Sequence, residues 1–174
     1  MDQLSQLLLD ARDGNQHALD AFVRRTQRDV WVMCRNLGDA DNAEDLVQDV
    51  YARALRSLGG YRGEGTARNW LLSIARRTCA DATRQRIRRR RHLSTKEPDE
   101  LSYVDPDRAL VDDLLAGLDP DRREAFVLTQ LAGCGYEDAA AVLGCPVGTV
   151  RSRVSRARQQ LLRVVADDPS EGTA

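Results

Sequence analysis

Hydrophobic residues recur along this chain at intervals of three and four positions, the spacing that places side chains on one face of an α-helix. Five stretches show this pattern, separated by polar or glycine-containing segments: 4–11, 18–33, 43–54, 70–78 and 147–161. The break at Gly14-Asn15 favours a turn, so the first two stretches are separate helices. The pattern predicts an all-α protein.

The third stretch, DNAEDLVQDVYARAL, begins with Asp41 and Glu44, which have the spacing of a capping box. Opposite its apolar stripe lies a polar face formed by Asp45, Gln48, Asp49 and Arg53. The segment SLGGYRGEGTARNW that comes next contains four glycines and predicts a loop. Thr66, near the end of this loop, can cap the following helix, whose inner face includes Trp70.

The polar segment 93–107 is acidic and contains two prolines, which is typical of a flexible linker. It separates a first helical domain, residues 1–92, from a second, residues 108–166, and residues 167–174 form a C-terminal tail. The expected fold is therefore all-α, with two small helical domains joined by a flexible acidic linker.

The second domain contains the pattern of a helix-turn-helix. Asp119 and Pro120 have the residue types of an N-cap and a first helical position. A short helix over 136–143 is followed by the turn Gly144-Cys145-Pro146 and a longer helix from Val147. Two helices joined by a short glycine-containing turn match a helix-turn-helix.

The last helix has an apolar face and an opposite face rich in hydrogen-bond donors. Val147, Val150, Val154, Ala157 and Leu161 share the apolar face. The polar face and its shoulders contain Thr149, Arg151, Ser152, Arg153, Ser155 and Arg156. An ordinary solvated helix mixes both signs of charge, but residues 147–163 contain five arginines and no carboxylate. The pattern favours a recognition helix that lies in the major groove of DNA.

The net charge of −1 conceals two segments of opposite charge. Residues 61–92 contain ten arginines against Glu64 and Asp81, whereas residues 97–121 contain nine carboxylates against Arg108. This asymmetry indicates a polyanionic partner. The run Arg86–Arg91 is either a solvated charged surface or a set of phosphate contacts.

Composition excludes several other classes of protein. The four cysteines show no CxxC spacing and neither histidine lies near one, so we expect no metal site. The chain shows no phosphate-binding glycine loop or catalytic Cys–His pair, and we expect neither an enzyme nor a bound cofactor. No apolar run is long enough to span a bilayer and the N-terminus lacks a signal-peptide pattern, which favours a cytoplasmic protein with reduced thiols.

Three motifs in order, DNAEDLVQDVYARAL, NWLLSIARRTCAD and GYEDAAAVLGCPVGTVRSRVSRAR, resemble the bacterial extracytoplasmic-function (ECF) sigma factors. The resemblance covers both domains. It implies a subunit that binds core RNA polymerase and directs promoter-specific initiation of transcription. The second domain would be sigma region 4 and would recognise the −35 element through the polar face of its last helix.

The first domain would be sigma region 2, which recognises the −10 element and helps to melt it. The resemblance matches the loop 62–69 to the segment that captures a flipped base, and the helix that follows to the path of the single strand. The residues implied for the −10 element are Arg62, Thr66, Asn69, Arg76, Arg77 and Arg84. This loop lacks an aromatic residue, so its backbone and Asn69 would have to hold the base.

The resemblance also implies protein partners. The face with Asp45, Gln48, Asp49 and Arg53 matches the surface that docks on the polymerase clamp helices. An anti-sigma factor is a further implied partner, although no residue of this sequence identifies it.

Two other functions are compatible with parts of the sequence. A stand-alone helix-turn-helix regulator would explain residues 136–162 but would leave the basic first domain without a role. A redox sensor could use a disulfide between Cys134 and Cys145, which flank the first helix of the helix-turn-helix. Buried, unreactive thiols are the favoured interpretation of these two cysteines.

Overall fold

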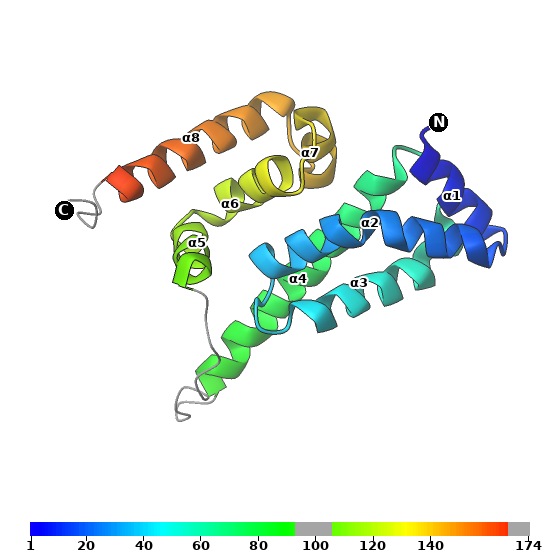
Figure 1. Ribbon diagram of the computed structural model, residues 1–174, viewed down its shortest axis with the longest axis horizontal. Helices are drawn as coiled ribbons and strands as arrows, with labels where there is room; N and C mark the ends of the chain where they lie inside the picture. The colour runs from blue at the N-terminus through cyan, green and yellow to red at the C-terminus, as the bar shows by residue number, and fades with distance from the viewer. Residues whose placement is uncertain (93–105, 167–174) are drawn as a thin grey trace.

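A computed structural model describes residues 1–92 and 106–166, and these residues form helices and short connections without a β-strand (Figure 1). The N-terminal elements are α1 (Gln3–Arg12), α2 (Gln16–Leu37), α3 (Ala43–Ser57), a 3-10 turn η1 (Leu58–Gly60) and α4 (Ala67–His92). The C-terminal elements are α5 (Pro106–Ala116), α6 (Pro120–Phe126), a π-helical turn η2 (Val127–Leu131), α7 (Tyr136–Leu143) and α8 (Val147–Ala166). The predicted fold class is confirmed.

The N-terminal unit consists of α2, α3 and α4 packed against one another, with α1 covering one end (Figure 1). The predicted apolar stripes supply its core, in which Val30, Met33, Val50 and Leu71 are completely buried. Asn15 caps α2 by accepting a hydrogen bond from the Ala18 amide, as its position after the Gly14 break allows. The amphipathic pattern therefore determines which faces of these helices meet.

The C-terminal unit contains the predicted helix-turn-helix. Gly144 ends α7 with a φ of 67°, a left-handed conformation that glycine adopts without steric cost. The turn leads directly into α8, and Val150, Val154 and Ala157 are buried on its predicted inner face. The packing of α8 on α6 and α7 leaves the opposite face of α8 exposed.

The two units pack together rather than lying apart. Helix α4 contacts α7, and α2 contacts η2 (Figure 1). One buried cluster includes Leu71 of α4, Leu128 of η2 and Ala139 of α7. The two regions therefore share a hydrophobic core in this arrangement.

The structure corrects one local prediction and leaves another outside its range. The capping box of Asp41 and Glu44 is wrong, because Asn42 is the N-cap of α3 and makes no side-chain capping bond. Asn42 has φ −114° and ψ 27°, and its side-chain amide donates to Asp39 instead. Residues 93–105 of the predicted linker 93–107, and the predicted tail 167–174, lie outside the described residues, whereas 106 and 107 begin α5.

Candidate DNA-binding and polymerase-binding surfaces

The exposed face of α8 contains most of the side chains predicted to contact the −35 element. Arg151, Ser152, Ser155 and Arg156 are all exposed, and Thr149 is partly buried near the start of the helix. The Ser152 hydroxyl donates to the Thr149 carbonyl at 3.0 Å. Four donor-bearing side chains thus share an accessible surface in the N-terminal half of the helix.

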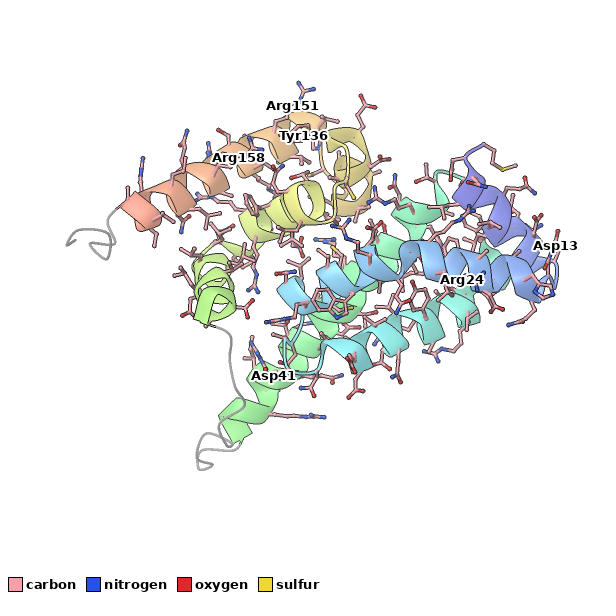
Figure 2. The ribbon with its side chains drawn as sticks, viewed as in Figure 1. Asp13, Arg24, Asp41, Tyr136, Arg151 and Arg158 are labelled. Atoms are coloured by element: carbon pink, nitrogen blue, oxygen red, sulfur yellow. The ribbon has the colours of Figure 1, made fainter. Side chains whose placement is uncertain are left out.

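Tyr136 of α7 supports the first arginine of this face. The Arg151 guanidinium carbon lies 5.8 Å from the centre of the Tyr136 ring, within the range of a cation–π interaction. Figure 2 shows the two residues at neighbouring ends of α7 and α8. Tyr136 itself is half-buried and packs against the core. Sequence analysis did not assign it a role, although it is the first residue of the first helix of the helix-turn-helix.

Arg153 differs from its neighbours on α8. Its guanidinium forms an ion pair with Asp121 of α6 and donates to Cys145 Sγ at 3.7 Å. Only 24% of the side chain is exposed. These contacts tie α8 to α6 and to the turn before it.

The candidate −10 residues lie on the loop before α4 and along that helix. Thr66 Oγ1 accepts a hydrogen bond from the Asn69 amide at 3.2 Å, which confirms the predicted cap. Arg62 and Arg77 are exposed. Arg84 donates to Asp81, and hydrogen bonds from Arg53 and then Arg84 lower the pKa of that carboxylate.

Several of these side chains are bound to the C-terminal unit. Asn69 Nδ2 donates to Asp138 Oδ1 at 2.7 Å, and Arg76 Nε pairs with Glu124 Oε2 at 2.8 Å. Arg68, which sequence analysis did not single out, donates from Nη2 to the Ala132 carbonyl at 2.6 Å. Neither the hydrophobic pattern nor the spacing of charges indicated these contacts. They place donors of the candidate −10 surface against region 108–166.

The candidate polymerase-binding face on α3 is open to solvent. Asp45, Gln48 and Asp49 are exposed, whereas Arg53 forms an ion pair with Asp81 of α4 at 2.8 Å. A hollow of about 660 Å³ extends this face onto α2. Its lining includes Gln48 from α3, together with Arg24, Arg28 and Trp31 from α2; Figure 2 marks Arg24. Sequence analysis missed the contribution of α2, because the exposed positions of one helix do not show which neighbour lies beside it.

Family models match both parts of the chain. Residues 22–91 match the model described as sigma-70 region 2, and residues 108–161 match sigma-70 region 4. The ECF RNA polymerase sigma factor SigC of Mycobacterium tuberculosis is 42% identical over 98% of this chain and 96% of its own length. The chain belongs to the ECF sigma factors. It is a promoter-recognising transcription initiation factor, and its family is a family of initiation factors that are not known as enzymes.

Another sequence relative and two solved structures are also similar to this sigma factor. The ECF RNA polymerase sigma-E factor of Escherichia coli K12 is 30% identical over 92% of this chain and 94% of its own length. The structure of CnrH in complex with the cytosolic domain of CnrY has a TM-score of 0.78 and 30% identity, and covers 96% of this chain and 99% of CnrH. RpoE from Bartonella quintana, in complex with the anti-sigma factor NepR, has a TM-score of 0.72 and 29% identity over 86% of this chain and 98% of RpoE.

The cysteines of this sigma factor are free thiols in the described structure. Burial raises the pKa of Cys134 to about 11, so its reactive thiolate form is scarce at neutral pH. Cys145 is partly exposed beside Arg153. The raised pKa of Cys134 favours an unreactive thiol over a disulfide with Cys145.

Within residues 1–92 and 106–166, no cluster of histidine, cysteine and carboxylate side chains has the arrangement of a metal site. The helices in the same residues also lack a span long and apolar enough to cross a membrane.

Proposed function

We propose that this sigma factor recognises the −35 element through Thr149, Arg151, Ser152, Ser155 and Arg156. One observation carries the proposal: α8 follows a helix-turn-helix turn and exposes four of these donors, with Thr149 partly buried beside them, on a surface without a carboxylate between 147 and 163. Arginine can bond two acceptors on guanine, and hydroxyl groups can hold phosphates. The exposed face of α8 therefore supplies both base recognition and positioning on the duplex.

Arg153 has a positioning role in this proposal. Its ion pair with Asp121 partly satisfies the guanidinium before DNA is present. Breaking that pair to contact a base would offset part of the energy gained. Arg153 therefore holds α8 at the correct angle on α6, and the neighbouring arginines contact DNA.

Residues 1–92 are the proposed region 2 and residues 108–166 the proposed region 4, joined by 93–107. Helix α1 lies outside the matched range 22–91, but it packs on α2 and α4 and so belongs with region 2. In region 2, the −10 element is read by Arg62, Thr66, Asn69, Arg76, Arg77 and Arg84.

Reading the −10 element requires a change of arrangement. Asn69 and Arg76 already bond to Asp138 and Glu124 of region 4. A DNA strand needs the same donors, so it competes with these acceptors for them. Promoter engagement therefore includes the separation of region 4 from α4.

Core RNA polymerase docks on Asp45, Gln48, Asp49 and Arg53 in this proposal, with the α2 side of the hollow completing the surface. An anti-sigma factor is a further proposed partner, supported by the similar structures of CnrH with CnrY and of RpoE with NepR. Since the polymerase and promoter DNA are cytoplasmic in bacteria, we place the chain in the cytoplasm.

Co-elution of the purified chain with core RNA polymerase, followed by transcription from a promoter library, tests the proposed function. We expect retention and new start sites that share two spaced sequence elements. Loss of retention, together with tight dimeric binding of the chain alone to palindromic duplex DNA, would favour the stand-alone regulator instead.

The Tyr136–Arg151 contact predicts a small effect on DNA binding. Tyr136→Leu should weaken binding to an intact −35 duplex by about 0.5 to 1 kcal/mol, because it removes the ring that holds Arg151. Tyr136→Phe keeps the ring and should retain wild-type affinity. A double-mutant cycle with Arg151→Ala measures the coupling. If Tyr136→Leu weakens DNA binding equally in the wild-type chain and in Arg151→Ala, Tyr136 does not position Arg151.

A further inference from the structure

Arg123 of α6 is a half-buried cation whose Nε atom has no hydrogen-bond partner in the described part of the chain. Its Nε atom is buried and makes no hydrogen bond, and the guanidinium forms no ion pair there. Burial lowers the pKa of Arg123, attraction to Asp112 opposes this effect, and repulsion from Arg86 adds to it. Asp112 already forms an ion pair with Arg35. The charge of Arg123 is therefore poorly compensated by the protein itself.

Arg123 lines a cavity of about 300 Å³ between the two regions. One wall comes from region 2 and includes Arg76 and Arg84 on α4. The other comes from region 4 and includes Arg123 and Glu124. The carboxylate of Glu124 pairs with Arg76, and that of Asp81 pairs with Arg84. Neither carboxylate therefore neutralises Arg123. The lining thus retains an excess of positive charge.

The rest of the lining is mainly apolar. Leu37 at the end of α2, and Leu118 and Pro120 before and at the start of α6, contribute to it. A buried cation costs free energy unless an anion pairs with it, whereas apolar walls favour an apolar ligand. The volume lies at the small end of the range of ligand sites. These properties select a small molecule that carries both a negative charge and an apolar body.

We propose that the cavity between α4 and α6 is a binding site for a small amphipathic carboxylate, whose acid group pairs with Arg123 and whose apolar part covers Leu37 and Leu118. The ligand contacts walls from both regions and so binds the packed arrangement better than the separated one. It therefore stabilises the arrangement in which Asn69 and Arg76 are held by region 4. This regulatory consequence rests on the proposed function, whereas the binding itself does not.

Titration of the full chain with octanoate, followed by NMR chemical shifts, tests the site. We expect saturable shifts in residues that line the cavity. Octan-1-ol, which lacks the charge, and inorganic phosphate, which lacks the apolar part, should each bind at least about tenfold more weakly. Equal affinity of either control compound would overturn the amphipathic carboxylate as the ligand.

Matched variants test whether Arg123 is the residue that pairs with the carboxylate of the ligand. Arg123→Gln should weaken octanoate binding about tenfold, and Arg123→Lys should retain most of it. Arg122→Gln is the control, because Arg122 bonds to Gln160 of α8 and does not line the cavity. Unchanged octanoate affinity in Arg123→Gln, with the fold confirmed by its NMR spectrum, would overturn the site.

Binding of single-stranded −10 DNA in the presence of octanoate tests the regulatory part. Octanoate should reduce DNA affinity in the wild-type chain and leave Arg123→Gln unaffected. Intact octanoate binding without an effect on DNA would overturn the regulation and leave the site standing. A chain that fails to retain polymerase would refute the proposed function without altering the octanoate result.

Discussion

Replacement of Asp49 by arginine should weaken binding to core RNA polymerase by about 2 to 5 kcal/mol. Asp49 is an exposed carboxylate in the middle of α3, on the face that includes Asp45 and Gln48. If this face docks on a basic surface, the reversed charge removes an attraction and introduces a repulsion. Competition for core polymerase against the wild-type chain measures the change.

Two observations separate a docking effect from a folding effect. Asp20→Arg reverses another exposed negative charge, on α2 and outside the proposed surface, and should leave polymerase affinity within about 0.5 kcal/mol of wild type. The thermal stability of Asp49→Arg should match that of the wild-type chain, since this side chain is exposed. Wild-type polymerase affinity in Asp49→Arg would disprove the assignment of this face.

Replacement of Arg156 by alanine should reduce binding to an intact −35 element by about 1 to 3 kcal/mol, provided that the guanidinium bonds a guanine through two hydrogen bonds. Arg156 is exposed on the polar face of α8. The measurement compares duplexes with an intact and a scrambled −35 sequence at one fixed salt concentration, because phosphate contacts depend on salt.

The matched control is Arg163→Ala. Arg163 is exposed in the last turns of α8, beyond the N-terminal half that enters the groove. Its removal should weaken binding to the intact and the scrambled duplex by similar amounts, and by less than Arg156→Ala weakens binding to the intact duplex. If Arg156→Ala also weakens both duplexes equally, Arg156 contacts the DNA backbone and does not read a base.

The elements of this fold could be predicted from the sequence because their signals are local. The period of the apolar residues, the Gly144 turn and the Thr66 cap each depend on neighbours only a few positions away. The π-helical turn Val127–Leu131 was not predicted, because it inserts one residue into an otherwise continuous apolar pattern.

The contacts between the two regions could not be predicted for a different physical reason. Arg76 and Glu124 are each ordinary charged positions on a helix surface, and their pairing depends on how two separate units approach. The same holds for Asn69 and Asp138. The candidate −10 residues were therefore identified by a resemblance to a family, while the engagement of Asn69 and Arg76 with region 4 required the structure.

The shared core gives the packed arrangement a dependence on temperature. Leu71 and Leu128 belong to one buried cluster, so separation of the regions exposes apolar surface to water and raises the heat capacity. Hydrophobic stabilisation weakens on cooling. Cold therefore shifts the balance toward separated regions, and the accessibility of Asn69 and Arg76 varies with temperature before any protein partner binds.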